Sequence, residues 1–564
     1  MTRTSRPWLV FCGLVCAVLV STCSCRTHRK TEPKPAPIPP PAVRPSPEVT
    51  PPPAPAPVVQ PVPQPPPAPA PAPKPTMVSS NPPVRIRLTH GIREIAFETT
   101  APGSVESQGR RTDLTPGRWT LRLTQARPPR RQFHVFTKTF KPWEENELKT
   151  YVSEWKSRGY PVEVASLGHP IQTASGYVLD CRQEWVSLQR FSSEAEADAL
   201  RKRLEAQSVW AWIRPEVLEA GAGNATLVGG SPQTSQSVSL PLTVHGTQPV
   251  RVSAGSKSGV YAGDLSVGVG PDSMFELFET SPVEDYLAGV LPAEMPALWP
   301  VEALKAQAVA ARSDVLMHMA IKHVLEGFNF TDSEGDRVYG GFSGRHPNTD
   351  VAVRETAGRV LAAANRIVAA TFSANCGGYS ENNETVWSAP ADPALRGVPD
   401  YPTGKGPTGG PLSEGMGKWL GSPPKAYCSD DAANFRWSKK LTAAEVTRLV
   451  NQKYRVGTVR TIEAGERGPS GRLKWVRVTG SESTATIRKE LAIRQAFGGL
   501  PSAMFIIEST PGPNGPVGFV FRGGGRGHGV GLCQQGARGM ALAGKRHDEI
   551  LAHYFSGATL ETLE

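Results

Sequence analysis

The chain has 564 residues, a formal net charge of +11, 55 prolines, 55 glycines and 8 cysteines. This length allows two to four domains, and a pI near 9.3 together with the cysteines is unlike an average cytosolic protein. A basic chain can bind nucleic acid, but the charge is scattered and an export signal begins the sequence. We therefore expect no nucleic-acid partner.

The N-terminus has the pattern of an export signal, predicted over residues 1–25. Two arginines lie within residues 1–6, and residues 8–20 form an apolar run of about 13 residues, too short for a comfortable membrane span. Residues 19–23 resemble a bacterial lipoprotein box in which Cys23 becomes the lipidated first residue. A simple cleaved signal and an uncleaved anchor remain the alternatives. The pattern predicts an exported protein of the cell envelope, in the periplasm or on the cell surface, held at the membrane.

Residues 26–83 are dominated by proline, alanine and valine. Such a segment cannot bury a core, so we predict an extended, semi-rigid linker of roughly 3 Å per residue. A proline-rich ligand for a partner domain is the alternative, and nothing else in the sequence supports it. Placed after a membrane anchor, such a linker would let the following domains act at a distance from the membrane.

The next three segments are predicted as a β-rich part, a small α+β domain and a linker. Residues 84–130 alternate apolar and polar side chains in strand fashion. Residues 131–216 hold two strand–helix–strand units, a βαββαβ pattern, which is similar to the SPOR family, whose members bind peptidoglycan strands stripped of stem peptides. A decorating domain without a ligand is the alternative. Residues 217–245, rich in glycine, serine and threonine, read as a linker or irregular hairpins.

Residues 246–564 contain the most informative segment, around Glu294. Between Tyr286 and Pro300 the chain is almost wholly apolar, and its only carboxylate is Glu294, between Pro292 and Pro296. A poorly hydrated carboxyl has a raised pKa and can act as a general acid near neutral pH. A glutamate in a surface turn is the plain alternative.

A helix is predicted to follow, from Pro300 to about residue 316. Its alanines lie on nearly every face, which indicates burial. Lys305 and Arg312 are seven residues apart and share one face. Because buried cations need anionic partners, both are expected to pair with carboxylates or an anionic ligand.

These two runs, residues 286–295 and 302–312, resemble the core of the stage II sporulation protein D (SpoIID/LytB) family, which contains lytic transglycosylases of peptidoglycan. The resemblance implies that Glu294 is the catalytic acid and that Lys305 and Arg312 support the active site. It also implies a SpoIID-like catalytic region over residues 246–564.

Members of that family often carry a zinc-binding His and Cys cluster before a Tyr-x-Gly motif. This chain has Tyr339 followed by two glycines and an upstream His323, but no cysteine between Cys181 and Cys376. Phe330 and Asp336 stand about where ligands are expected. A structural zinc site needs about four ligands, so no metal and no cofactor are predicted here.

Two later segments are expected to line a groove. Residues 367–378 end in glycines, which let a ligand approach the backbone; Ser373 and the following Tyr379 are candidate substrate contacts, with Tyr339. Trp387 suits a sugar ring or the core. Cys376 and Cys428 could form a disulfide, but nothing in the sequence pairs them.

The C-terminal segment 525–537 surrounds one arginine and one histidine with five glycines. It resembles the family motif and lacks the Lys-Ser/Thr ending of a phosphate loop. Arg526, His528 and Gln534 are expected to contact substrate, with a structural role as the alternative for His528. Cys533 stands where many relatives have serine, so it is not assigned as a nucleophile.

The expected chemistry follows from having one candidate carboxyl group. Hydrolysis of a glycosidic bond normally requires two carboxyl groups. A lytic transglycosylase can use one, because the C6 hydroxyl of muramic acid attacks its own anomeric carbon, and Glu294 acts first as acid and then as base. Were Glu284, Asp285 or Glu302 to face the site as well, hydrolysis would be favoured.

The prediction is a multidomain α+β protein, with a SpoIID-like catalytic core and a SPOR-like domain, that cleaves MurNAc–GlcNAc bonds of glycan strands. Denuded strands are polyanions, which fits a basic protein with Lys305, Arg312 and Arg526. The alternative is a noncatalytic peptidoglycan-binding protein or an activator of a cell-wall hydrolase. The expected partners are glycan strands, an amidase or other cell-wall enzyme, and the membrane.

Overall fold

The computed structural model describes residues 78–564 apart from 388, 403–405 and 408. The predicted signal, Cys23 and nearly all of the proline-rich segment lie outside the described residues. Helices and several separate sheets occur together in the described part, which confirms a multidomain α+β protein. None of the described helices is long and apolar enough to cross a membrane.

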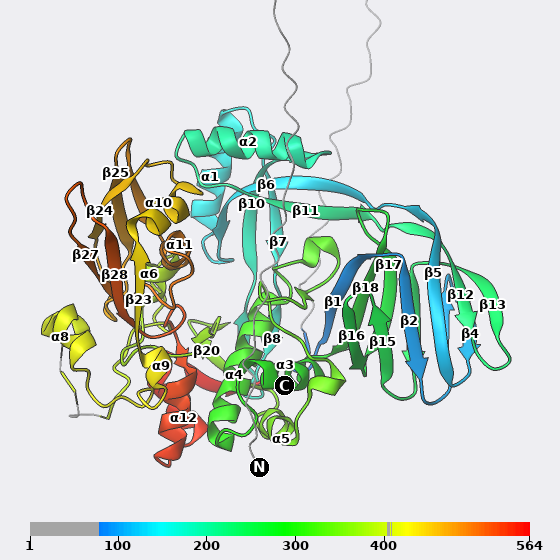
Figure 1. Cartoon of the computed structure of the whole chain (residues 1–564). Helices are drawn as coiled ribbons and strands as arrows, with labels where there is room; N and C mark the ends of the chain where they lie inside the picture. Colours follow the sequence, from blue (N-terminus) through cyan, green and yellow to red (C-terminus); the bar gives the residue numbers. More distant parts are fainter. Residues whose placement is uncertain (1–77, 388, 403–405, 408) are drawn as a thin grey trace, which may run out of the picture. The chain divides into compact units, whose positions relative to one another are not determined.

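Two large sheets are built from the first half of the described chain (Figure 1). The first has seven strands in the spatial order β19 (Phe330–Thr331), β1 (Pro83–Ile92), β18 (Phe275–Pro282), β17 (Asp264–Val269), β14 (Leu242–Gly246), β3 (Gly103–Ser107) and β4 (Arg110–Leu114). The second has six, in the order β13 (Thr234–Leu240), β12 (Ala222–Gly229), β5 (Gly117–Arg127), β2 (Glu94–Thr99), β15 (Val250–Ala254) and β16 (Lys257–Tyr261).

The strands of both sheets contribute to one apolar core because every second side chain faces it. In β1 the residues Val84, Ile86 and Leu88 are buried, and in β12 Ala225 and Leu227 are buried. This is the period of two that half-buried strands require. The sequence predicted a linker or irregular hairpins over residues 217–245. The structure has β12, β13 and the start of β14 there.

A four-stranded sheet with two helices is inserted between β5 and β12, which pair with each other. Its order is β11 (Trp212–Glu219), β6 (Arg130–Phe140), β10 (Gln183–Phe191) and β7 (Glu163–Leu167), and its helices are α1 (Glu145–Ser157) and α2 (Glu194–Ala206). An apolar cluster that includes Val135, Trp155 and Leu200 belongs to this insertion. A short hairpin, β8 (Pro170–Gln172) and β9 (Val178–Asp180), follows β7.

A group of helices centres on α4 (Val301–His318). From Ala303 to Met317 the side chains of α4 are buried except Lys305, so the predicted buried helix is confirmed. The elements in contact with α4 are α3 (Val283–Glu294), α5 (Pro347–Glu355), α12 (Gln534–Leu542), α13 (His547–Tyr554), β20 (Arg359–Ala363) and β21 (Arg366–Ile367). Strand β20 also pairs with β30 (Thr559–Thr562), and β22 (Phe372–Ser373) runs parallel to β29 (Leu532–Cys533).

The remaining C-terminal segment forms two three-stranded sheets with their own apolar core. Their strands are β23 (Arg436–Thr442), β28 (Gly518–Gly524) and β27 (Phe505–Thr510), and β24 (Val459–Ala464), β25 (Trp475–Gly480) and β26 (Thr484–Arg488). Helices α10 (Ala443–Asn451) and α11 (Glu490–Ala496) accompany them. The short elements are η1 (Val324–Glu326), η2 (Phe342–Gly344), α6 (Asn383–Trp387), α7 (Gly410–Glu414), α8 (Met416–Gly421) and α9 (Ala432–Phe435).

Candidate active site

Glu294 is the last residue of α3, at the turn into α4. The helix ends there because Met295 is extended, with φ −140° and ψ 132°, a conformation that the following Pro296 favours in the residue before it. Pro300 then precedes the first residue of α4, where its fixed φ suits a helix start. The two prolines therefore fix a short turn that presents the Glu294 side chain at its first residue.

The Glu294 carboxyl is largely removed from water but still reachable. Its side chain is 22% exposed. Burial raises its pKa above the ordinary value, and the nearby Arg337 guanidinium offsets part of that effect. Three other carboxyls among the described residues, Glu279, Glu381 and Asp400, also have a pKa raised by burial, but those three residues are almost wholly buried.

Arg337 links Glu294 to a second carboxylate, Asp314 on α4. Its Nη1 lies 3.5 Å from Glu294 Oε1, and its Nη2 donates a short hydrogen bond to Asp314 Oδ2. His318 Nδ1 lies 3.1 Å from Asp314 Oδ1. Burial alone would raise the pKa of Asp314, but the charges of His318 and Arg337 hold it well below its usual range.

The pKa values of the two carboxyls are therefore shifted in opposite directions. Burial favours the protonated form of Glu294, whereas the charges of His318 and Arg337 favour the ionised form of Asp314. Since Arg337 and His318 contact both Asp314 oxygens, that carboxylate is engaged rather than free to activate a water molecule.

The glycine-rich segment 525–537 reaches this site. Gln534, the first residue of α12, donates from Nε2 to the Glu294 carbonyl oxygen at 3.0 Å. Strand β29 of this segment runs parallel to β22, whose Phe372 ring lies 4.9 Å from the Arg337 guanidinium. Burial and then the charge of Arg472 lower the pKa of His528 to about 4, so its imidazole is neutral at pH 7.

Gly531 shows why this segment needs glycine. Its φ is +70°, and an added Cβ would lie 2.2 Å from the Thr371 carbonyl oxygen. Neither the backbone conformation nor the space admits a side chain. The parallel pairing of β22 with β29 depends on this close approach, because Leu532 donates from its backbone to the same Thr371 oxygen at 3.1 Å.

Lys305 and Arg312 pair with carboxylates other than Glu294. Lys305 Nζ lies 2.8 Å from both Glu302 and Glu355. Arg312 is fully buried and makes a two-pronged ion pair with Glu284, each distance being 2.7 Å. The expectation that buried cations have anionic partners is thus met within the protein.

The other candidate residues fall into two groups. His528 and Ser373 lie together, since Ser373 Oγ accepts from the Gly529 backbone at 3.2 Å, and the His528 ring is 5.1 Å from that of Trp387, which is 41% exposed. Arg526 is exposed in the same segment. Tyr339 is buried against Tyr286, and Tyr379 packs in a small cluster with Trp419.

The three carboxylates that would have favoured hydrolysis are engaged elsewhere. Glu284 holds Arg312, Asp285 lies 3.1 Å from Arg345, and Glu302 binds Lys305 and His547. Around His323, the Nε2 atom lies 3.2 Å from Asp336 Oδ2, so two of the residues considered for a zinc site contact each other.

Sequence reasoning missed Arg337 and Asp314. Asp314 is an acid within a helix predicted to be buried, which signals a cationic partner. Arg337, two residues before Tyr339, is that cationic partner. The sequence did not reveal it, because 23 positions separate Arg337 from Asp314 and no short motif joins the two residues.

Comparison with known proteins gives two matched regions. Residues 272–362, which include Glu294, Asp314 and Arg337, match the family model described as stage II sporulation protein. Residues 381–531 match a model described as a domain of unknown function.

Among curated proteins, the chain is 30% identical over 302 residues to an uncharacterised protein of Brachyspira hyodysenteriae, covering 53% of this chain and 72% of that protein. It is 29% identical over 300 residues to the stage II sporulation protein D of Bacillus subtilis, covering 50% and 75%. It is also 29% identical over 295 residues to the amidase enhancer of Bacillus subtilis, covering 49% of this chain and 40% of that protein.

Proposed function

Since the chain belongs to the stage II sporulation protein D family, we propose that it acts on the bacterial cell wall as a lytic transglycosylase, cleaving MurNAc–GlcNAc bonds of peptidoglycan glycan strands. The single observation that carries the proposal is Glu294, a partly exposed carboxyl whose pKa is raised by burial beside one arginine. A general acid at neutral pH needs that combination of access and retained proton.

In the proposed reaction Glu294 gives its proton to the glycosidic oxygen as the bond to the muramic acid anomeric carbon breaks. The C6 hydroxyl of the same muramic acid then attacks that carbon, and the Glu294 carboxylate accepts the hydroxyl proton. The glutamate ends the cycle protonated as it began, and no water is consumed. Arg337, 3.5 Å from the carboxyl, stabilises the carboxylate formed midway.

One carboxyl suffices for this route, whereas hydrolysis needs a second that is free to act. Glu284, Asp285 and Glu302 are held by basic partners. Asp314 is near Arg337 but its oxygens are bound by Arg337 and His318. The arrangement therefore supports transglycosylation over hydrolysis.

The substrate contacts proposed for this site come from the glycine-rich segment and its neighbours. Neutral His528 can donate or accept a hydrogen bond with a sugar hydroxyl, and Trp387, 5.1 Å from it, offers a partly exposed ring face. Exposed Arg526 suits the lactyl carboxylates of a strand that has lost its stem peptides. Lys305 and Arg312 act through the fold, because each is paired with carboxylates.

The insertion over residues 131–216 is proposed to be a SPOR-like module that guides the enzyme to denuded strands. Its four-stranded sheet and two helices have the expected βαββαβ order. Phe136 and Trp185 on this sheet are buried in the main core, so a strand has to bind elsewhere on the module. Export to the cell envelope and lipidation of Cys23 belong to the same proposal.

The test is mass spectrometry of the products that the purified protein forms from glycan strands with and without stem peptides. Products ending in 1,6-anhydromuramic acid are expected, and Glu294→Gln should abolish them. Glu334→Gln is the matched control, because Glu334 is exposed and should leave the products unchanged. Reducing-end products would contradict transglycosylation.

A second candidate is a noncatalytic role, favoured by the similarity to a protein named amidase enhancer. In that case the protein binds strands, leaves them intact and raises the rate of a separate amidase. Glu294→Gln would then keep full enhancement, which distinguishes the two functions in one set of assays.

A further inference from the structure

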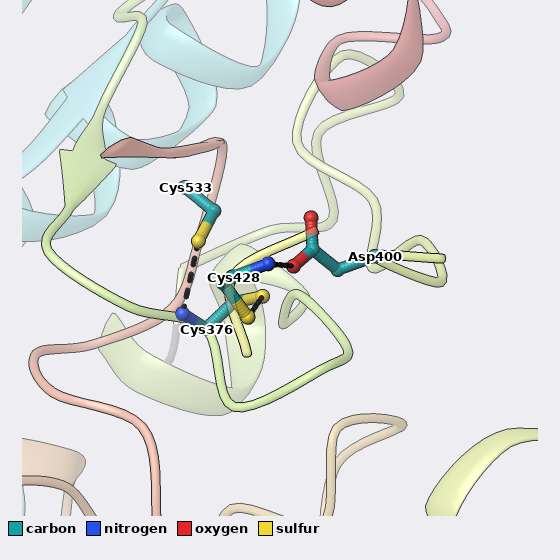
Figure 2. Close-up of side chains that lie close together, drawn as sticks. All are labelled: Cys376, Asp400, Cys428 and Cys533. Carbon is teal, nitrogen blue, oxygen red and sulfur yellow. Dashed lines mark hydrogen bonds between the residues drawn. The ribbon is translucent and has the colours of Figure 1, made fainter. Parts of the chain in front are cut away.

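Four side chains with metal-binding atoms meet in the interior although they are far apart in sequence. Cys376 follows β22, Asp400 and Cys428 lie in the segment between α6 and α9, and Cys533 ends β29 (Figure 2). All four residues are fully buried. One ligand atom from each, three Sγ atoms and a carboxylate oxygen, lies within 4.8 Å of the others.

The sulfur spacing fits a shared ion. Zinc binds thiolate sulfur at about 2.3 Å with tetrahedral geometry, which places two sulfur ligands about 3.8 Å apart. The Cys376 and Cys428 Sγ atoms are 3.8 Å apart. A disulfide would need sulfur atoms about 2 Å apart, and all three cysteines are free thiols.

The surroundings orient the ligands as metal sites usually do. Cys533 Sγ accepts hydrogen bonds from the Cys376 backbone at 3.2 Å and from the Gly536 backbone at 3.3 Å. Asp400 accepts from the Cys428 backbone at 3.0 Å and from the Tyr554 hydroxyl. Outer hydrogen bonds of this kind fix the orientation of metal ligands.

Among the described residues, the cluster has no cationic side chain as a partner for its carboxyl group. Burying a carboxylate away from water is costly unless an opposite charge accompanies it. Within the part of the chain that the structure describes, no lysine, arginine or histidine forms a salt bridge with Asp400. A small divalent ion bound by all four ligand atoms would supply the opposite charge that the ionised groups require.

We propose that Cys376, Asp400, Cys428 and Cys533 form a structural zinc site. Three thiolates and one carboxylate complete a tetrahedral set, so the ion has no open position for a reacting water. Each thiol loses its proton to solvent as it ligates, and no electron is transferred. Soft sulfur ligands favour zinc over magnesium or calcium.

This site is separate from the cluster that relatives carry before the Tyr-x-Gly motif, where His323 and Asp336 lie here. It ties the chain after β22 to the start of α12, so it holds the element whose first residue, Gln534, bonds the Glu294 backbone. The zinc would therefore position the glycine-rich segment against Glu294 without taking part in the reaction.

The first measurement is the metal content of the full-length protein, purified without a histidine tag or chelator. About one zinc per chain is expected. Cys428→Ser and Cys533→Ser should each lose most of it. Cys181→Ser is the matched control, because Cys181 is also a buried free thiol but lies outside the cluster, and it should retain the metal. The proposal is overturned if the wild-type protein binds no zinc even after incubation with the metal. It is also overturned if only the Cys181→Ser control loses zinc and the two cluster variants retain it.

A second measurement needs no variant and covers the case in which the serine variants do not fold. Cobalt added to the metal-free wild-type protein should give the intense visible absorption of a tetrahedral thiolate site, and zinc should displace it. Weak absorption typical of six oxygen ligands overturns the assignment. So does a disulfide joining two of the three cysteines, detected by mass spectrometry of the unreduced exported protein. Neither readout depends on glycan cleavage.

Discussion

Replacing Arg312 with methionine is expected to destabilise the protein without impairing the chemistry of the folded molecule. Arg312 has no exposed surface, and its guanidinium holds Glu284 through two contacts of 2.7 Å. It also donates to the carbonyl oxygens of Val353 and Arg359, each at 3.2 Å. The substitution leaves the Glu284 carboxylate, 19% exposed, without its cation.

Removing one partner of a buried ion pair costs ~3–5 kcal/mol. For a domain of 150–250 residues each kcal/mol lowers Tm by about 2–4 °C, so the expected fall is roughly 6–20 °C. Lys305→Met is the matched control on the same helix face. Its ion pairs reach the surface, since Glu355 is 48% exposed, and its loss should cost about 1 kcal/mol or less.

The assay is thermal unfolding by circular dichroism, with glycan cleavage measured well below both transitions. Adding Glu284→Leu to Arg312→Met should recover part of the lost Tm, because the orphaned carboxylate is removed. A Tm change in Arg312→Met no larger than that of Lys305→Met would refute the reasoning. So would complete loss of cleavage in fully folded Arg312→Met protein, because that result would put Arg312 in the reaction itself.

Three further predictions concern the site. Cleavage should fall as pH rises through the raised pKa of Glu294, because the protonated acid is lost. In Arg337→Gln this fall should move to higher pH, since the cation that lowers the pKa is gone; an unchanged or lower pH–rate limb would contradict the assignment. Gly531→Ala should lower Tm much more than the control Gly544→Ala does. Gly544 also has a positive φ but open space around it, so its substitution should cost only the backbone strain of about 1–2 kcal/mol. Equal Tm shifts in the two variants would argue against the close approach of Gly531 to Thr371. Trp387→Ala should raise KM for glycan strands several-fold at constant Tm, and an unchanged KM would remove Trp387 from the binding surface.

Local patterns predicted much of this structure. The buried helix α4 followed from alanines on nearly every face, and its cations have the carboxylate partners that burial demands. The desolvated setting of Glu294 followed from its apolar neighbours and two flanking prolines. These features depend on residues close in sequence, for which spacing alone predicts burial and direction.

Contacts between distant segments were not predictable in the same way. Asp314 on α4 meets Arg337 from a later loop. The pairing of β22 with β29 brings Cys376 near Cys533, and Cys428 joins them from the segment before α9. The strands β12 and β13 were also hard to foresee, because their glycine and serine content resembles a linker. Their alternating buried residues, such as Val238 and Leu240, become meaningful beside β5.

Strand β1 determines how a mechanical load would enter the protein. Ahead of it, Val78 and Ser80 donate from the backbone to the carbonyl oxygens of Pro170 and Glu564. Pro83 is the first residue of β1, which lies between β18 and β19. Once those two bonds had broken, a pull along β1 from Pro83 would load the whole β1–β18 pairing, which runs from Pro83 opposite Pro282 to Ile92 opposite Phe275. Its hydrogen bonds would then be sheared together rather than opened one at a time. A load applied at the N-terminal side of β1 would therefore meet many hydrogen bonds at once, and the described part of the chain would resist unravelling from that side.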